Sequence, residues 1–254
     1  MANVLVNDAS LADIADAIRE KNGTEETYKP AEMGEAVRAI ESGDSYYDTF
    51  WDAFQKYGNR TDFCSAFSAG NAEGASVWND EILKPKYDMY VTNAQAMFAH
   101  NQSITDLSSL GVILDFSKVK GDAGFTFTFQ NCANLKKLPV IDLSSQLVQL
   151  HSTFIKCEAL QELNIRNLAE SVKFTRPFDN CNALETLSIT GTIGNSVSFA
   201  QSSLLSSESV QNIIDCLKDL TGGTAQTLTL HTDVKAKLTE TQIATITGKN
   251  WTLA

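Results

Sequence analysis

The chain has 254 residues, 43% of them hydrophobic and 20% charged, so it can bury a sizeable core and is not a largely disordered chain. A formal net charge of −11 disfavours nucleic acid as a partner, because binding to phosphates needs clustered positive charge. The sequence has no apolar run long enough to cross a membrane and no basic leader followed by an apolar segment, so we expect neither membrane insertion nor export. Its five cysteines are an odd number, so we expect free thiols in a protein that is made in a cytoplasm.

The charge is unevenly distributed along the chain. Residues 1–42 carry nine acidic and four basic side chains, and residues 43–90 carry eight and four, which accounts for −9 of the net −11. The remaining residues are close to neutral. The sequence therefore predicts two different surfaces, an acidic N-terminal part and a near-neutral remainder.

Residues 1–42 predict a small helical hairpin. Ser10 and Asp13 have the spacing of a capping box, Gly23 suits a helix C-terminus, Pro30 suits the first turn of a second helix, and Gly43 follows it. Each helix is too short to be stable alone, so its apolar stripe must pack on the other helix, the rest of the chain or another copy. Attachment or oligomerisation and simple packing on its own chain both remain open. The candidate attachment residues are Leu11, Ile14, Ile18, Met33, Val37 and Ile40.

Residues 43–90 form an aromatic-rich connector. Aromatic residues at positions 47, 50, 51 and 54 fit one side of a helix, a spacing that is typical of core packing. We predict that this segment is an N-terminal cap, because the end of a stack of repeats would otherwise expose its apolar side to water.

Residues 91–195 contain an internal repeat. The pattern F-x-x-C-x-x-L-x-x-L occurs as "FQNCANLKKL", "FIKCEALQEL" and "FDNCNALETL", with a degenerate copy, "FAHNQSITDL", before them. A period of 20–30 residues is typical of a leucine-rich solenoid, in which stacked periods share one core and a parallel sheet. The predicted inward residues are Phe98, Phe129, Cys132, Leu135, Leu138, Phe154, Cys157, Leu160, Leu163, Phe178, Cys181, Leu184 and Leu187.

The three repeated cysteines predict a packed column of small buried hydrophobes. The alternative, a metal site, needs a fourth ligand and a polar setting, and His151 has no counterpart in the other copies. On this view Cys157→Ser places a hydroxyl without a partner in an apolar stack and costs about 1–3 kcal/mol, more than Cys157→Ala. We expect no metal and no cofactor.

No catalytic motif is present in the sequence. There is no G-x-S-x-G, H-E-x-x-H, Gly-rich phosphate loop or C-x-x-C, and Cys64 has no histidine near it in sequence. An enzyme with a site assembled from loops is therefore the least favoured hypothesis.

Residues 196–254 predict a C-terminal capping unit. "SSESVQNIIDCLKDLTGG" indicates a helix with a Ser N-cap, an apolar face and a Gly stop, "AQTLTLHTD" a strand, "VKAKLTETQIATITGK" a helix, and "NWTL" a last strand. We expect Trp251 to fill the core of this unit. The predicted fold class is α+β: a short leucine-rich-repeat solenoid with an N-terminal helical hairpin and an α/β C-terminal cap.

The repeat, followed by "PVIDLS", resembles the BspA-like, or Treponema-type, leucine-rich repeats. The N-terminal "LADIADAIREKNGTEETYKPAEMGEAVRAI" resembles a hairpin found at the start of many phage and prophage virion proteins of Gram-positive hosts. "FWDAFQKYGNRTDF" and the C-terminal segment resemble companions of these repeats in prophage proteins. Secreted adhesins of the repeat family carry export signals and longer, regular arrays, and this chain departs from both features.

These resemblances imply a non-enzymatic virion protein of a tail, baseplate or fibre, made in the cytoplasm of the host bacterium. Its partners would be other virion proteins, further copies bound through the hairpin, and a host surface protein or glycan. The alternative is a bacterial cell-surface adhesin with leucine-rich repeats. The outward positions Lys136, Lys137, Gln161, Glu162, Glu185 and Thr186 are the predicted recognition surface, although they also fit a merely solvated face.

Overall fold

The computed structural model describes residues 62–69, 89–110, 114–143 and 145–254, all of which belong to one compact unit, Asn59–Ala254. The predicted hairpin 1–42 and its six candidate attachment residues, Leu11, Ile14, Ile18, Met33, Val37 and Ile40, lie outside the described residues. So do the aromatic residues at 47, 50, 51 and 54. Of the predicted connector, residues 62–69 and 89–90 are described.

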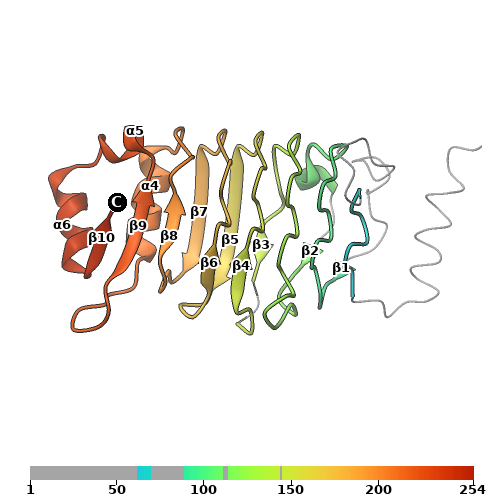
Figure 1. The fold of residues 1–254 in the computed structure, drawn as a ribbon, viewed down its shortest axis with the longest axis horizontal. Helices are drawn as coiled ribbons and strands as arrows, with labels where there is room; N and C mark the ends of the chain where they lie inside the picture. The colour runs from blue at the N-terminus through green and yellow to red at the C-terminus, as the bar shows by residue number, and fades with distance from the viewer. Residues whose placement is uncertain (1–61, 70–88, 111–113, 144) are drawn as a thin grey trace, which may run out of the picture. The chain divides into compact units, whose positions relative to one another are not determined.

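Short strands follow one another along the described chain (Figure 1). They form small sheets in the orders β1-β2, β3-β5-β7, β4-β6 and β10-β9-β8, and each of these pairings is parallel. The strands are β1 (Met89–Tyr90), β2 (Leu114–Asp115), β3 (Ile141–Asp142), β4 (Gln149–His151), β5 (Glu162–Leu168), β6 (Lys173–Thr175), β7 (Thr186–Gly191), β8 (Val197–Phe199), β9 (Gln226–Leu230) and β10 (Trp251–Leu253).

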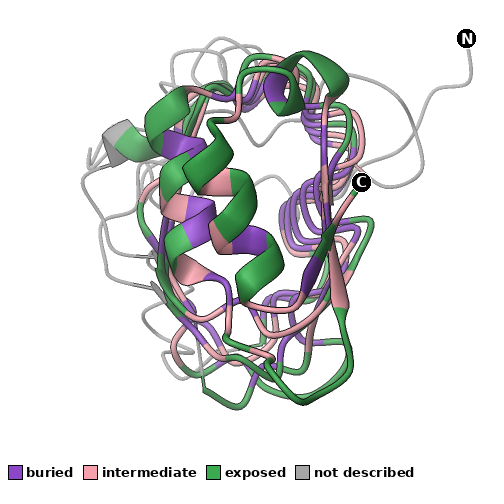
Figure 2. Cartoon of the chain, turned by 90° about the vertical axis from the view of Figure 1, so that its left-hand side faces the viewer, coloured by how far each residue is buried: buried purple, intermediate pink, exposed green. Residues whose placement is uncertain are grey.

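The α-helices of the described residues gather at the C-terminal end (Figure 1). Figure 2 views this end, where α4 buries four residues, Ser209, Val210, Ile213 and Ile214, and the two later helices bury one each, Val234 and Ile246. The helices are α4 (Ser207–Cys216), α5 (Thr232–Lys235) and α6 (Glu240–Gly248), and a 3-10 turn, η1 (Leu107–Leu110), lies earlier in the chain.

The strands β5 and β7 follow from the L-x-x-L-x-I pattern of the repeat. In β5, Leu163 and Ile165 are buried while Glu162 and Asn164 are partly exposed, as the alternation of a strand requires. Leu163 pairs with Leu187 of β7 in register, so the same apolar positions of successive repeats meet on the inner side of the sheet.

In each repeat the chain changes direction around the phenylalanine, and we call this segment the corner. Non-glycine residues of the corner adopt the left-handed backbone conformation, with positive φ. The residues two before and two after the phenylalanine have φ between 48° and 62° in the repeats of Phe98, Phe129, Phe154 and Phe178: Ala96, His100, Phe127, Asn131, Ser152, Lys156, Arg176 and Asn180. This conformation costs an L-residue about 1–2 kcal/mol. It must therefore be held by contacts elsewhere in the corner.

Those contacts are backbone hydrogen bonds between successive repeats. Alternate N–H groups of a corner donate to carbonyl oxygens of the next one, as Phe127 N does to His151 O (3.0 Å), Phe129 N to Thr153 O (2.9 Å) and Asn131 N to Ile155 O (2.8 Å). The same alternation recurs from corner to corner, so the buried backbone donors of the corners are satisfied by the neighbouring repeat.

The helix α4 begins where the sequence predicts and ends earlier. Ser206 is its N-cap and accepts a hydrogen bond from Ser209 N. The predicted stop at Gly222 and Gly223 is wrong, because the helix ends at Cys216 with Leu217 as its C-cap. The chain leaves the helix there because Lys218 N donates to Ile193 O (2.9 Å), which pairs this segment with the preceding repeat.

The helix predicted over "VKAKLTETQIATITGK" is two helices, α5 and α6. Thr239 interrupts it because its side chain and that of Gln242 form a capping box that starts α6. After α6, the Lys249 Nζ donates to the carbonyl oxygens of Ile214 and Leu217 (2.9 Å each) and so caps the end of α4. Trp251 in β10 is buried, as predicted, and its Nε1 donates to Lys218 O (2.8 Å).

The described part of the chain thus has helices and parallel strands in mixed content, and its strands form no closed barrel. The assignment to a leucine-rich-repeat solenoid stays a prediction. None of the helices in the described ranges combines the length and the apolar character that a membrane span requires.

Candidate recognition surface

The repeated phenylalanines form a column of stacked rings. The centroids of Phe98 and Phe129 lie 5.2 Å apart, those of Phe129 and Phe154 5.6 Å, and those of Phe154 and Phe178 5.8 Å, with interplanar angles of 6° or less. Each of these four rings is at most 1% exposed. The repeat period of the sequence therefore becomes one continuous buried column.

Two further rings extend the column beyond the predicted copies. Phe67 stacks on Phe98 at 5.3 Å, and Phe199 stacks on Phe178 at 4.8 Å. The sequence carries a signal for the second, because Phe199, Ser202 and Leu205 keep the F-x-x-x-x-x-L spacing with serine in place of cysteine. Both positions lie outside the repeat boundaries 91–195 that the pattern predicts.

The cysteines of the repeat are hydrogen-bond donors to the preceding repeat. The Sγ atoms of Cys132, Cys157 and Cys181 lie 3.0, 3.0 and 3.1 Å from the carbonyl oxygens of Phe98, Phe129 and Phe154. All three side chains are buried. Each of these carbonyl groups also accepts a backbone hydrogen bond, from Asn101 N, Cys132 N and Cys157 N in turn, so the thiol is a second donor to it.

Other residues at this position of the repeat are also donors. Asn101 occupies it in the degenerate copy and its Nδ2 donates to Phe67 O (3.1 Å). Ser202 occupies it in the copy of Phe199, and its Oγ donates to Cys181 O (3.2 Å). The position therefore selects small or medium side chains that can donate, and the description of these cysteines as purely apolar knobs is wrong.

This hydrogen bond reverses the order expected for two Cys157 variants. A serine at 157 finds Phe129 O within reach, so we expect Cys157→Ser to lose about 1 kcal/mol or less. Cys157→Ala removes the donor and leaves a small void, and we expect it to cost about 1–3 kcal/mol. Urea unfolding of the two variants beside the wild type measures both losses; an alanine variant more stable than the serine variant would contradict the donor role.

The repeated leucine positions complete the inner side. Leu135, Leu160 and Leu184 follow the cysteines, and Leu138, Leu163 and Leu187 come three residues later. All six are at most 4% exposed. With the phenylalanines and cysteines above, every predicted inward residue lies in the interior of the described unit.

The predicted recognition residues lie on the outer side of the sheet β3-β5-β7 and of the residues that lead into it. Lys137 bridges Glu162 in parallel register, Glu162 pairs with Thr186, and Asp106 bridges Lys137 from the other side. Lys136, Lys137, Gln161, Glu185 and Thr186 are exposed, and Glu162 is partly exposed. We call this surface, of Asp106 and the six predicted residues, the charged face.

The charged face presents both signs of charge without internal ion pairs at its lysines. The pairs found among the described residues join Arg176 to Asp179, Lys218 to Glu170 and His231 to Asp233. The ammonium groups of Lys136 and Lys137 therefore keep their capacity to bind a partner. Alternating signs also suit hydrogen-bonded contact better than a grip on phosphate groups.

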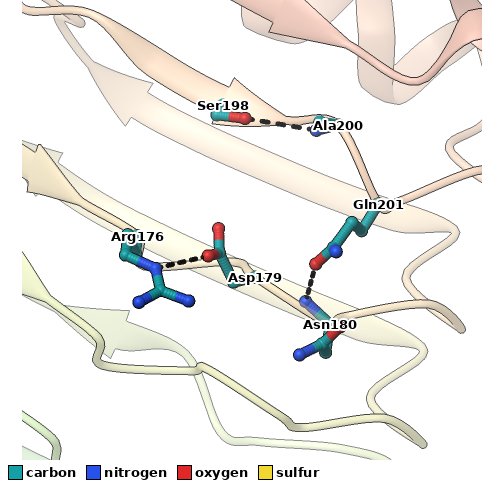
Figure 3. A network of polar contacts seen from close by, with 6 residues as sticks. All are labelled: Arg176, Asp179, Asn180, Ser198, Ala200 and Gln201. Atoms are coloured by element: carbon teal, nitrogen blue, oxygen red, sulfur yellow. Dashed lines mark hydrogen bonds and ion pairs between the residues drawn. The ribbon is translucent and has the colours of Figure 1, made fainter.

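Side-chain contacts join the last predicted repeat to the copy of Phe199 (Figure 3). The Gln201 Oε1 accepts a hydrogen bond from Asn180 N, and the Arg176 Nε donates to Asp179 Oδ2 (2.6 Å). Within the copy of Phe199, Ala200 N donates to Ser198 Oγ (3.3 Å). At this corner the side-chain oxygen of Gln201 accepts the hydrogen bond that a backbone carbonyl oxygen accepts between the earlier corners.

The described residues hold no cluster of three histidine, cysteine, aspartate or glutamate side chains with the geometry of a metal site. Burial raises the pKa of the Cys157 and Cys181 thiols well above its ordinary value, which disfavours the thiolate form that binds metals. The three histidines are separate: His100 contacts Asn131, His151 contacts Phe127, and His231 caps α5.

A small hollow lies between α4, α5 and α6. Its lining is mainly apolar, and Lys237 is its one titratable side chain: Leu205, Ser207, Val210, Val234, Lys237, Leu238 and Gln242. This hollow therefore offers no pair of groups for acid–base chemistry.

Comparisons of the chain with protein-family models, with curated proteins and with solved structures found no match.

Proposed function

We propose that the described unit is a BspA-like leucine-rich-repeat solenoid in a non-enzymatic phage or prophage virion protein, part of a tail, baseplate or fibre. In this proposal the repeats present a surface for the recognition of the host or of a partner protein. The observation that carries the proposal is the unbroken column of buried phenylalanines with its cysteine donors, which commits the interior to packing and leaves polar side chains outside.

A surface of this kind suits recognition because its backbone is fixed before binding. Each corner is hydrogen-bonded to the next, so the outer side chains stand on a rigid support and little conformational entropy is lost on contact. Exposed residues such as Lys136, Gln161 and Glu185 can vary without disturbing the column.

The acidic N-terminal part takes the second role, attachment to the particle or to other copies. Residues 1–90 carry a net charge of −9, of which −5 lies in the predicted hairpin 1–42, and this hairpin offers one apolar stripe on each predicted helix. The resemblance of this segment to the start of virion proteins supports the same role. Attachment and recognition would then divide near residue 42.

Removal of residues 1–42 tests this division. We expect the truncated chain to unfold cooperatively, because the column lies in Asn59–Ala254 and the truncation keeps the whole predicted connector 43–90. We also expect it to bind saturably to an envelope fraction of host cells and to be absent from assembled particles. Circular dichroism, a cell-binding isotherm and mass spectrometry of purified particles measure the three properties, with the full chain as control.

Two results would contradict the proposal: incorporation of the truncated chain into particles, or no saturable binding of the folded truncated chain to any envelope fraction. Fractionation of producing cells separates the proposal from a bacterial adhesin. A virion protein should sediment with particles, whereas an adhesin should remain with the cell envelope.

A further inference from the structure

A second outer surface lies along the strands β4, β6, β8, β9 and β10. The pairs His151–Thr175, Ser198–Thr229 and Thr227–Thr252 are in register across paired strands. Leu150, Val197, Leu228 and Trp251, which are chain neighbours of five of them, are buried, and Thr175 is itself exposed, so these six residues lie on the outer side. The strand β8 contacts β6, and the five strands follow one another along the unit (Figure 1). We call these six residues the hydroxyl face.

The hydroxyl face differs from the rest of this acidic protein in its charge. Lys173 is the one charged residue in the five strands. The strands β3, β5 and β7 by contrast carry Asp142, Glu162 and Arg166. A phosphate or a strongly charged protein surface would therefore find few charges to pair with on the hydroxyl face.

The threonine hydroxyls of this face are not used by the fold. Those of Thr175, Thr227, Thr229 and Thr252 make no hydrogen bond to another residue in the described part of the chain. Threonines elsewhere in the unit donate to backbone carbonyls, as Thr153 Oγ1 does to Phe125 O (3.1 Å) and Thr245 Oγ1 to Thr241 O (2.8 Å). The free hydroxyls can both donate and accept.

An aromatic ring lies at the N-terminal end of this face. Phe127 is partly exposed, and its ring meets that of His151 edge-on with centroids 5.1 Å apart. The corresponding positions of other repeats hold Ala96, Ser152 and Arg176, so the corner itself does not require an aromatic residue. A partly exposed ring beside polar groups suits the apolar face of a sugar.

We propose that the hydroxyl face and Phe127 bind an uncharged oligosaccharide that lies across the strands. Adjacent strands are about 4.8 Å apart, a spacing similar to one sugar unit of an extended chain. Successive sugars would then meet successive threonine hydroxyls, and the ring of Phe127 would stack on one of them. The inference builds on the proposed recognition role but moves the ligand away from the charged face.

Full-length protein tests the inference on an array of neutral, sialylated and sulfated oligosaccharides, supplemented with neutral polysaccharide extracted from bacterial cell walls. We expect binding to neutral glycans that persists at high salt, because it involves no ion pairs. Thr229→Val with Thr252→Val removes two hydroxyls and keeps the side-chain shape, so we expect about tenfold weaker binding. Phe127→Ala should weaken it by a similar factor.

The matched control is Ser188→Ala with Thr241→Val, which removes one hydroxyl from β7 and one from α6, both outside the hydroxyl face and the charged face. We expect unchanged binding from it, and melting temperatures near the wild type for all variants. Binding to charged glycans alone, or an equal loss in the control, would overturn the inference. If host cells bind the protein saturably but no neutral glycan does, the inference fails while the proposed function stands; if neither binds, both fail.

Discussion

We expect Phe154→Ala to lower the free energy of unfolding by about 3–5 kcal/mol. The ring is 0% exposed and stacks between Phe129 and Phe178, so its removal opens a cavity in the middle of the column. The neighbouring repeats cannot close that cavity easily, because Phe154 N donates to Pro177 O and Phe154 O accepts from Cys181 Sγ. Urea unfolding followed by circular dichroism measures the loss.

Phe127→Ala is the matched control for this variant. It removes the same side chain one repeat earlier, from a partly exposed position outside the column. We expect a loss of about 1 kcal/mol or less. If the two variants lost equal stability, or if Phe154→Ala remained as stable as the wild type, the phenylalanine column would not be the main core of the unit.

The inner side of the repeats could be predicted from the sequence because it depends on residue type and spacing alone. Phe129, Phe154 and Phe178 recur at one phase with cysteine and leucine at fixed distances, and a period shared by large apolar residues indicates burial. The copy of Phe199 departs from this pattern, because serine replaces cysteine and α4 begins where the next leucine position would lie.

The role of the cysteines could not be predicted, because their acceptors are backbone atoms of another repeat. Cys157 Sγ reaches Phe129 O across 28 residues, and no pattern of side chains records the position of a carbonyl group. The left-handed corners were hidden for a similar reason. Residues such as Ser152 and Lys156 adopt positive φ because hydrogen bonds between repeats hold them there, without the glycines that usually mark such turns.

The two candidate surfaces also differ in how far the sequence predicts them. Six residues of the charged face could be predicted because they fall between the inward positions of recognisable repeats, whereas Asp106 joins them only through its bridge to Lys137. The hydroxyl face combines β4 and β6 with three strands of the C-terminal unit, and Thr227 and Thr252 become neighbours only through the register of β9 and β10. These two residues are 25 positions apart in the sequence, and sequence spacing alone does not show that they lie side by side.

The second large effect is expected from Gly191→Ala, which should cost about 3 kcal/mol or more. Gly191 has φ +118°, and a Cβ atom on it would lie 2.3 Å from Leu168 O and 2.6 Å from Leu168 N. The contact cannot relax freely, because Leu168 O also accepts a hydrogen bond from Thr192 N (2.8 Å). The β5–β7 pairing shifts register between Ile165 and Leu168, so the close approach of Gly191 lets the sheet continue past an irregularity.

Two further glycines separate the causes of that loss. Gly222 also has positive φ (+79°) but nothing lies within 4 Å of its added Cβ, so Gly222→Ala should cost only the backbone term of about 1 kcal/mol. Gly248 has open space and no positive φ, so Gly248→Ala should leave stability unchanged or slightly higher. The urea midpoint should therefore be highest for Gly248→Ala, lower for Gly222→Ala and lowest for Gly191→Ala. A Gly191 variant no less stable than the Gly222 variant would mean that the backbones of β5 and β7 are not in close contact at Leu168.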